Sequence, residues 1–509
     1  MLDFIDNFLN RVTMYRLVLY CLTFLVLAST VLSFFGMLPF SPASIVFTAV
    51  IFTAVCFVVN KIFEKVFEAP TNVESLYITA LILTLIVSPI DFSNYSASLP
   101  IVLWSSIFAM ASKFILAIGK KHIFNPAAFS VLLTAIVMGQ YASWWVGSAS
   151  MSIFVLLGGI LIVRKIKRTD LVAGFFMGAF ITVGVFGMIN DQGLYQVWSG
   201  LVLNSPLLFF GFIMMTEPLT TPPSRWLRVS YGVLTGFLFA PPVHLFFAYS
   251  TPETALLAGN IFSYIVSPKK KLLLKIKEKI AVAENTFEFI FKPDSTFNFS
   301  PGQYMEWTIP HEKPDNRGNR RYFTIASSPT EAEIRFGTKF YENGSSFKKK
   351  LKEINEKDPI VASGLSGDFV MPKDKNKKLV FVAGGIGITP FRSMIKYLTD
   401  KNEKRDIVLV YSNKTASEIA YKKIFDDAEY KIGLKTVYTV TDQKEMPINW
   451  LGFTERLNAK MIASQIPDYS ERIFYLSGPH SMVSGFRNTL IEMGVSRSKI
   501  KTDYFPGFA

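Results

Sequence analysis

The feature that most constrains this 509-residue sequence is an abrupt change of composition at Pro268. Residues 1–267 consist largely of apolar stretches that end in Lys269-Lys270-Lys271, whereas residues 268–509 have the mixed composition of a water-soluble enzyme. Hydrophobic residues make up 50% of the chain and charged residues only 18%, which is typical of a polytopic membrane protein. The sequence thus predicts one region in a membrane and one region in water. It also indicates a protein that couples cytoplasmic chemistry to the membrane.

The charges of the two regions differ as well. Of the 53 Lys and Arg residues, 13 lie in residues 1–267, together with 10 of the 39 Asp and Glu residues. Most of the net charge of +14 therefore lies in residues 268–509, where a basic face could rest on an anionic membrane leaflet. No basic cluster with interleaved aromatic residues stands out, so we expect membrane lipid and no nucleic acid as a partner.

Ten apolar stretches mark the first region. They cover residues 15–36, 42–60, 75–90, 100–118, 124–140, 150–163, 171–189, 199–214, 229–249 and 254–267. Lys and Arg follow the second, fourth, sixth and eighth stretches, whereas the alternate loops contain no Lys or Arg. The positive-inside rule then places both termini in the cytoplasm. We expect an all-α bundle of about ten transmembrane helices, multi-pass in the cell (inner, cytoplasmic) membrane.

Several of these stretches are shorter than the roughly 20 residues of a straight span. Short or Pro/Gly-interrupted spans often mark broken helices around a ligand site near the membrane midplane. Imprecise boundaries would explain the short stretches about as well, so both interpretations stay open.

The chain has two cysteines, Cys21 and Cys56, which lie in the first two apolar stretches. Two thiols cannot form a disulfide framework, and an iron–sulfur cluster held by this chain alone needs about four. We expect both cysteines to be small buried apolar residues, and we expect no metal site.

The second region carries an ordered series of motifs. Residues 299–304 and 320–329 lie in a β-rich stretch whose alternating apolar and polar positions predict a small antiparallel barrel. Residues 379–391 have the pattern of a buried strand, a glycine-rich turn and a helix start, where backbone amides can approach a phosphate. Strands at 407–412 and 474–480 continue a strand–helix alternation typical of a doubly wound parallel sheet.

In this order the motifs resemble the ferredoxin-NADP reductase superfamily over about residues 272–509. The resemblance implies an antiparallel β-barrel FAD domain at 268–373 and an α/β doubly wound NAD(P) domain at 374–509. It also implies an FAD-dependent NAD(P)H dehydrogenase, in which hydride passes from the nicotinamide C4 to the flavin N5 without a protein base.

The flavin-binding residues follow from this resemblance. The family's Arg-x-Tyr-Ser/Thr sequence falls on Arg321, Tyr322, Phe323 and Thr324. Arg321 is then expected to pair with the FAD pyrophosphate, Phe323 to pack on the isoalloxazine, and Thr324 to offer a hydrogen bond toward N5. A guanidinium fork suits a pyrophosphate, and an aromatic plane suits a ring. A second flavin-phosphate loop of the family matches Gly344, Ser345 and Ser346.

The nucleotide-binding residues come from the same resemblance. The pyrophosphate loop of the family matches Gly384, Gly385, Gly387, Thr389 and Pro390. Gly478 and Pro479 match the family's Cys-Gly-Pro, so Ser477 takes the place of a thiol near the nicotinamide. The C-terminal aromatic that covers the flavin in this family is assigned to Phe505 rather than to Tyr504.

The choice between NADH and NADPH depends on the residues after the strand that ends at Tyr411. Basic or hydroxyl side chains there could bind a 2'-phosphate, and Ser412, Asn413 and Lys414 are of this kind. The same residues could form an ordinary exposed loop, and the sequence favours NADH only slightly.

Residues 1–267 carry a second resemblance, to the NqrB/RnfD membrane-subunit family. It rests on residues 120–129 and 212–222, which place Asn125 before Pro126 and Thr216-Glu217 before Pro218. We expect Asn125, Thr216 and Glu217 to bind a cofactor as part of an inward-pointing polar pair at membrane depth. Helix caps at the cytoplasmic surface are the alternative.

One departure from that family matters for the cofactor. The family attaches FMN covalently to the threonine of a Ser-Gly-Ala-Thr motif, and the nearest stretch here, residues 147–152, has no equivalent threonine. Covalent flavin is therefore not expected, while a noncovalent FMN, riboflavin or quinone is compatible with the same fold.

A haem-bearing bundle is disfavoured by the histidines. Two haems need about four histidines inside the spans. Only His122 and His244 lie in or beside the apolar stretches, near opposite faces of the expected bundle.

Together these features predict a membrane-bound flavoprotein oxidoreductase. It would pass electrons from cytoplasmic NAD(P)H, with FAD as cofactor, to a quinone or a membrane-bound flavin, or across the membrane. The alternative is a redox-driven transporter of an ion or small solute with a reductase module. The sequence leaves other subunits open.

Overall fold

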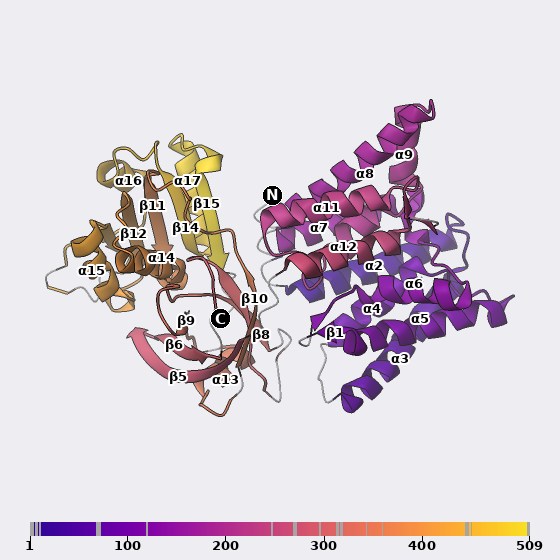
Figure 1. Ribbon diagram of the computed structural model, residues 1–509, viewed down its shortest axis with the longest axis horizontal. Helices are drawn as coiled ribbons and strands as arrows, with labels where there is room; N and C mark the ends of the chain where they lie inside the picture. The colour runs from indigo at the N-terminus through magenta and orange to yellow at the C-terminus, as the bar shows by residue number, and fades with distance from the viewer. Residues whose placement is uncertain are drawn as a thin grey trace. The chain divides into compact units, whose positions relative to one another are not determined.

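The protein has two compact units, Met1–Ser267 and Pro268–Ala509 (Figure 1). The structure is a computed structural model that describes residues 5, 9, 12–67, 73–118, 121–245, 248–267, 272–294, 297–311, 315, 319–342, 344–358, 360–442, 447–448 and 450–505. Residues 268–271, where the composition changes, lie outside this set. Each unit is therefore described by itself.

The N-terminal unit is helical, which confirms the expected all-α character of this region. Its helices are α2 Met14–Phe34, α3 Pro42–Val66, α4 Val73–Ile86, α5 Tyr95–Ile115, α6 Pro126–Met138, α7 Ala149–Ile166, α8 Thr169–Ile189, α9 Leu194–Leu203, α10 Leu207–Phe209, α11 Arg225–Phe239 and α12 Pro252–Val266. Shorter elements are the 3-10 turn η1 Trp145–Gly147, the π-helical turn η2 Phe210–Met214 and the strand pairs β1 Ala117–Ile118 with β2 Lys121–His122 and β3 His244–Leu245 with β4 Ala248–Tyr249.

Five of the described helices, α2, α3, α5, α7 and α8, are long and apolar enough to cross a membrane. A sixth span would need α9 and the segment Leu207–Met214, which are bent by 64°. This finding corrects the expectation of about ten transmembrane helices. The other apolar stretches form helices of only 13 to 15 residues, which extend about 20–22 Å, less than a hydrocarbon core of about 30 Å.

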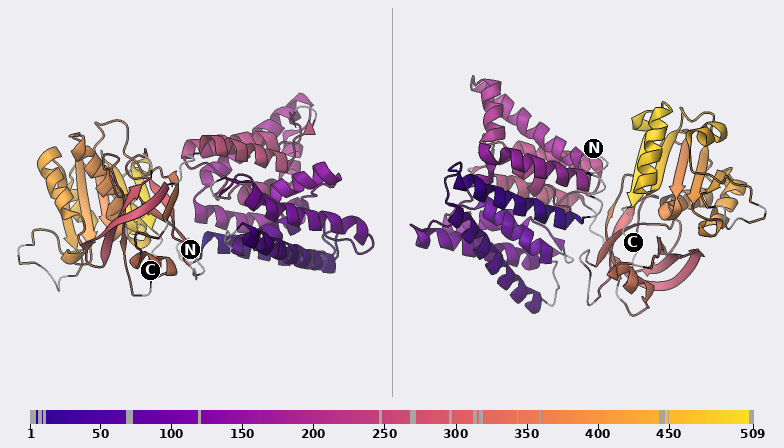
Figure 2. Two further views of the ribbon diagram at one scale, coloured as in Figure 1. Left: turned by 60° about the horizontal axis from the view of Figure 1, so that its bottom comes forward. Right: turned by 180° about the vertical axis from the view of Figure 1, so that it is seen from behind.

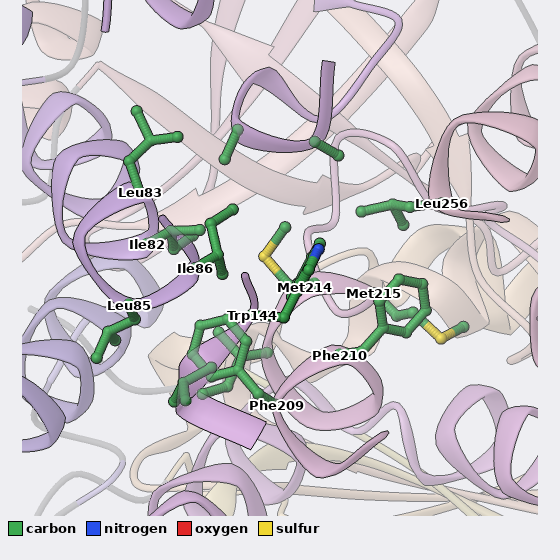
Figure 3. Packing of buried hydrophobic residues seen from close by; sticks show 14 of the residues in the cluster. Ile82, Leu83, Leu85, Ile86, Trp144, Phe209, Phe210, Met214, Met215 and Leu256 are labelled. Carbon is green, nitrogen blue, oxygen red and sulfur yellow. The ribbon is translucent and has the colours of Figure 1, made fainter. Parts of the chain in front are cut away.

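The centre of the helical unit is closely packed with apolar side chains. Trp144, Phe209 and Phe210 lie beside Met214 and Met215 in this core (Figure 3). Cys21 and Cys56 are buried and free, which confirms that they are small apolar core residues.

Helices α8 and α11 approach each other closely because glycines line both contact faces. A Cβ on Gly174 would lie 2.8 Å from the Val229 carbonyl oxygen, and one on Gly178 would lie 2.6 Å from that of Val233. Gly232 and Gly236 of α11 approach the backbone of α8 even more closely. Reciprocal small-xxx-small patterns of this kind let helix backbones touch where no larger residue fits.

The first sheet of the C-terminal unit is antiparallel, as the sequence predicted. Its strands are β5 Leu272–Ala283, β6 Thr286–Pro293, β7 Tyr304–Thr308, β8 Arg320–Thr324, β9 Ile334–Lys339 and β10 Ile360–Ser366, in the order β8-β7-β10-β5-β6-β9. Trp307, Phe289, Phe291 and Phe336 fill its core, and the short helix α13 Ser346–Lys352 packs there through Phe347.

The second sheet is parallel, as expected for a doubly wound domain. It contains β11 Leu379–Gly384, β12 Ile407–Asn413, β13 Lys435–Val440, β14 Ile473–Pro479 and β15 Ile500–Phe505, in the order β13-β12-β11-β14-β15. The surrounding helical elements are η3 Gly385–Ile388, α14 Thr389–Asp400, η4 Ala416–Glu418, α15 Lys422–Ile432, α16 Ala459–Gln465, α17 His480–Glu492 and η5 Arg497–Lys499. Alternate residues of β11 pack against α14 and α15 on one face and α16 and α17 on the other (Figure 2).

The strand order places a topological switch point beside β11. The chain runs outward from β11 to β12 and β13 on one side, and β14 and β15 lie on the other side. In open α/β sheets a ligand binds at the carboxyl ends of the strands at such a point.

Candidate functional site

The glycine-rich turn lies at the carboxyl end of β11. It is formed by Gly384, Gly385, Gly387, Thr389 and Pro390, the last two in the first turn of α14. Gly385 has a φ of +51°, which favours glycine. A Cβ on Gly387 would lie 2.5 Å from the carbonyl carbon of Ser477, so only glycine lets the turn rest against the end of β14. The structure thus brings the predicted phosphate turn against Ser477, Gly478 and Pro479.

The predicted flavin strand β8 presents its residues alternately to two faces. Tyr322 is 56% exposed, and its hydroxyl donates to Glu306 Oε2 at 2.9 Å. Phe323 is half-buried and stacks on Phe336, with ring centres 4.5 Å apart and planes 6° apart. The ring expected to lie against the isoalloxazine is therefore supported from one side by the core of the sheet.

Arg321 and the first residue of α13 both contact the side chain of Asp315. The Arg321 guanidinium stands 5.2 Å from the ring centre of Phe347, and its Nη2 lies 3.6 Å from Asp315 Oδ1. The backbone N–H of Ser346 donates to Asp315 Oδ2 at 3.0 Å, and the Ser345 hydroxyl caps α13. A guanidinium and helix-start amides around a carboxylate are groups suited to an anion such as a phosphate. Gly344 directly precedes this cap.

Two hydroxyl groups of the predicted site are buried without a hydrogen-bond partner among the described residues. They are Thr324 Oγ1, at the end of β8, and Ser477 Oγ, at the end of β14. Buried polar groups are normally hydrogen-bonded, so each of these atoms can take a hydrogen bond from a water molecule or a bound group. These two positions fit a flavin and a nicotinamide, which carry polar ring and amide atoms.

The two sheets are tied together directly behind these residues. The Arg392 Nη1 of α14 donates to the Ala326 carbonyl at 3.0 Å, and the Ser393 hydroxyl donates to the Ser327 carbonyl at 2.6 Å. Ala326 follows Thr324 by two residues, and Arg392 follows Thr389 by three. The bonds therefore hold the end of β8 and the start of α14 at a fixed separation.

Arg392 is also the centre of a buried ion cluster, and it is only 3% exposed. Its Nη2 donates to Glu331 Oε1 at 3.0 Å, and its Nε lies 3.7 Å from Glu288 Oε1. Arg335 reaches the same two carboxylates at 3.4 and 3.1 Å. Burial disfavours the charge of Arg392, but the hydrogen bonds and charges of Glu331 and Glu288 outweigh burial and raise its pKa.

Sequence reasoning missed this cluster. Arg392 could have been noticed because it lies one turn into the helix that follows the glycine-rich turn. No local pattern identifies Glu331, 61 residues away in the sequence, as its partner.

Phe505 ends β15, where its backbone pairs in register with Pro479. The side chains of Phe505 and Tyr504 lie outside what the structure describes, so the assignment of the flavin-covering aromatic stays a prediction.

In the helical unit the structure brings Asn125 and Glu217 together. Asn125 Nδ2 donates to Glu217 Oε2 at 3.0 Å. Asn125 Oδ1 also accepts the backbone N–H of Ala128 at 3.1 Å and so caps α6. Asn125 thus serves both as a helix cap and as a member of the expected polar pair. The hydroxyl of Thr216 donates back to the carbonyls of Phe212 and Ile213 instead.

Two further buried polar residues, which sequence reasoning missed, extend this pair. Asn260 Oδ1 accepts the backbone N–H of Asn125 at 2.8 Å, and its Nδ2 donates to the Tyr231 hydroxyl at 3.3 Å. Asn260 is 1% exposed and Tyr231 is fully buried. Asn260 could have been found as the one amide within the apolar stretch 254–267.

Part of this chain is similar to known proteins and to one protein-family model. Residues 381–488 match the family model of the oxidoreductase NAD-binding domain. The chain is 25% identical over 241 residues to a flavohemoprotein of Bacillus cereus, covering 45% of this chain and 60% of that protein. It is 27% identical over 224 residues to a glycine betaine monooxygenase reductase subunit of Pseudomonas aeruginosa, covering 43% and 60%. The chain spans about three fifths of the length of these curated relatives.

Among solved structures, the FAD/NAD-binding domain of a nitric oxide dioxygenase from Vibrio cholerae superposes with a TM-score of 0.40 at 19% identity, covering 46% of this chain and 98% of that one. The family model lies wholly within the C-terminal unit, so the resemblance of the helical unit to the NqrB/RnfD family stays a prediction. The family model therefore indicates an oxidoreductase NAD-binding domain at residues 381–488, and the curated relatives named above are a flavohemoprotein and a reductase subunit.

Proposed function

We propose that this protein is a membrane-bound flavoprotein oxidoreductase that oxidises cytoplasmic NAD(P)H and delivers the electrons to an acceptor in its helical unit. The observation that carries the proposal is the pair of buried hydroxyls of Thr324 and Ser477, which have no hydrogen-bond partner among the residues that the structure describes. They lie at the ends of β8 and β14, and the bonds of Arg392 and Ser393 join α14 to the segment that follows β8. The membrane location is supported by five helices long and apolar enough to span.

The residues of the antiparallel sheet fit an FAD. Arg321 and the backbone N–H of Ser346 would hold its pyrophosphate, the Phe323 ring would support the isoalloxazine, and Thr324 would complete a hydrogen bond to it. When bound, FAD supplies the conversion between two-electron hydride chemistry and single-electron transfer.

The parallel sheet would receive the nicotinamide nucleotide. The turn from Gly385 to Thr389 offers backbone amides and a helix N-terminus to the pyrophosphate. Ser477, whose buried hydroxyl has no partner within the described part of the chain, would orient the nicotinamide. A direct hydride transfer to the flavin would need no side chain as a base here.

Substitution of Arg321 tests the flavin site, with Arg320 as the matched control. We expect Arg321→Leu to weaken FAD binding by about 10- to 100-fold, since a charge-assisted hydrogen bond to a pyrophosphate is lost. Arg320 lies next to it but pairs with Glu306 across the exposed face, at 3.3 Å, so Arg320→Leu should keep its flavin. Flavin absorbance per purified protein measures both. A colourless wild type, or equal loss in both variants, would refute the flavin site.

The proposed acceptor is a quinone or a noncovalent FMN or riboflavin in the helical unit. The partly buried Asn125–Glu217 pair, extended by the buried Asn260, supports this location, as does the resemblance to the NqrB/RnfD family. Glu217→Gln should lower quinone reduction by NADH while ferricyanide reduction at the C-terminal unit persists. Glu64→Gln, which removes a carboxylate paired with Lys61 at 2.9 Å on α3, is the control.

A redox-driven transporter of an ion or small solute is the second candidate. The Glu217 carboxylate, in the pair with Asn125, favours it. Electron transfer alone predicts that NAD(P)H oxidation in proteoliposomes is indifferent to Na⁺ and membrane potential. Coupled transport predicts that both change the rate.

A further inference from the structure

Gly337 lies inside β9, at a point where the antiparallel sheet meets the parallel-sheet domain. Its φ is not in the left-handed region, so the backbone alone would accept any residue here. A Cβ on Gly337 would lie 2.7 Å from the Tyr421 hydroxyl oxygen, 3.1 Å from Thr389 Cγ2 and 3.3 Å from Ile386 Cδ1. A glycine inside a strand often marks such a close approach. The position therefore needs glycine for space, not for conformation.

These contacts join the nucleotide turn to the strand that supports the predicted flavin site. Ile386 lies in η3 and Thr389 begins α14, so two of the three contacts come from the glycine-rich turn itself. Phe336, the residue before Gly337, stacks on Phe323, the ring expected to lie against the isoalloxazine. A change of spacing at Gly337 would therefore move the turn relative to the support of that ring.

Tyr421 occupies this junction from the segment directly before α15. Its backbone has a φ of +60°, in the left-handed region that few residues other than glycine adopt. The residue is 8% exposed, and its ring centre lies 5.7 Å from the Arg392 guanidinium carbon. A backbone of this kind persists only where the surrounding structure holds it, and it is frequent at sites that need a fixed geometry.

The Tyr421 hydroxyl lies beside the Glu288 carboxylate, and Glu288 pairs with Gly337 across β6 and β9. Burial, followed by the charge of Glu288, raises the pKa of this phenol well above its usual value. The group is thus a neutral hydroxyl at ordinary pH. Because Arg392 lies against the ring and Glu288 lies beside the hydroxyl, the side chain cannot make room for a larger residue at position 337 without leaving both.

We propose that Gly337 and Tyr421 are positioning residues that set the spacing between the nucleotide turn and the flavin strand, and through it the rate of hydride transfer. The inference rests on the proposed function. In that step a hydride, one proton with two electrons, would leave the nicotinamide C4 and join the flavin N5, so the nicotinamide is oxidised and the flavin is reduced.

Hydride transfer is sensitive to spacing, because the reacting atoms must approach to about 3–3.5 Å and a misplacement of about 1 Å can cost about 100-fold in rate. The methyl group added by Gly337→Ala would meet the Tyr421 hydroxyl at 2.7 Å, whereas an ordinary contact begins at 3.4 Å. The shift that the substitution demands is therefore large enough to slow the step.

The experiment uses full-length protein in lipid nanodiscs and follows flavin reduction by NAD(P)H in an anaerobic stopped-flow instrument. Gly337→Ala should keep its FAD and its affinity for the nucleotide but reduce the flavin about 10- to 100-fold more slowly. Adding Tyr421→Phe removes the oxygen that the new methyl group meets, and should bring the rate back to within about 5-fold of the wild type. Gly485→Ala, on α17, meets nothing within 4 Å and is the control.

Hydrogen–deuterium exchange of the flavin-free protein gives a second readout that needs no electron transfer. Gly337→Ala should speed the exchange of the amides of residues 385–389 by about 10-fold, and the added Tyr421→Phe should reverse most of this change. Tyr421→Phe alone keeps the close approach but loses the hydroxyl beside Glu288, and should slow flavin reduction by about 3-fold. Tyr430→Phe, on α15, alters a side chain that is 91% exposed and should have no effect.

Three results would overturn the inference: flavin reduction in Gly337→Ala at the wild-type rate, a double variant as slow as the single one, or a loss of FAD in proportion to the loss of rate. If Gly337→Ala does not fold, the comparison of Tyr421→Phe with Tyr430→Phe decides, and equal rates in the two count against the inference. A wild type that binds no flavin, or whose flavin neither NADH nor NADPH reduces, refutes the proposed function instead.

Discussion

The helical unit and the C-terminal unit differ in the kind of contact that joins their secondary-structure elements. In the helical unit, α8 and α11 meet through glycines whose missing side chains let the backbones touch. In the C-terminal unit, two sheets meet through Arg392, a buried cation bonded to Glu331 and near Glu288. The first junction is lined by glycines and has one ion pair near its end, Arg228 with Asp170 at 2.7 Å, whereas the second is organised around a buried charge.

The difference is what we expect if the helical unit lies in a membrane, as proposed, and the C-terminal unit lies in water. In lipid, apolar side chains gain little by leaving the solvent, so helices associate through close packing and small residues. Between two water-exposed sheets, a buried charge costs several kcal/mol unless it is fully paired, but once paired it fixes one geometry. Close packing sets a distance, whereas the ion cluster also sets an orientation, which the proposed hydride transfer from a nicotinamide to a flavin would require.

The largest effect is expected from breaking the ion cluster. Arg392→Met leaves Glu331 and Glu288 buried with less compensation and should destabilise the C-terminal unit by about 3–5 kcal/mol. Hydrogen–deuterium exchange of the β11 amides measures the loss. Lys396→Met, on the same helix, breaks only a partly exposed pair with Asp400 and should cost less than about 1 kcal/mol. Equal effects of the two substitutions would mean that the cluster does not join the sheets.

A smaller effect is expected from the glycine junction. A Cβ on Gly236 would clash with the Phe175 backbone, so Gly236→Ala should destabilise the helical unit by about 1–3 kcal/mol, the usual cost of overpacking. Thermal unfolding in detergent measures it. Gly200→Ala, on α9, meets nothing within 4 Å and is the control. If the two substitutions behave alike, backbone contact is not what holds α8 and α11 together.

The smallest effect is expected from a partly exposed ion pair, between Asp468 and Arg472. A hydrogen bond from Arg472, at 2.7 Å, lowers the pKa of Asp468 from 3.8 to about 2. A lowered folded-state pKa means that the stabilisation is present above pH 3.8 and is lost as the pH falls toward 2. Because the carboxylate is partly exposed, we expect less than about 1 kcal/mol. The stability difference between wild type and Asp468→Asn, followed by acid titration, should therefore vanish near pH 2; a difference that persists there would contradict this origin.

Local motifs made one part of the site predictable. The turn around Gly387 could be identified because a strand, a glycine pattern and a helix start follow one another within a few residues. The same holds for Asn125, since an amide directly before Pro126 is a typical start of a helix.

The remaining features depend on contacts between distant residues. Asn260 meets Asn125 from 135 residues away, and Arg392 meets Glu331 from 61 residues away. Helix length was also poorly predicted, because a long apolar stretch such as 229–249 continues past Phe239 into a turn and the strand pair of β3 and β4. An apolar pattern reports burial, but the turn that ends a helix depends on what packs beyond it.

The replacement of a thiol by Ser477 has a practical consequence. Both cysteines of the chain lie buried in the helical unit, so residues 268–509 contain none. Peroxides and maleimides that act on thiols have no target beside the nucleotide turn. A single cysteine introduced on the exposed face of α15 could therefore carry a fluorophore or spin label, and the distance between the two units could be followed during turnover.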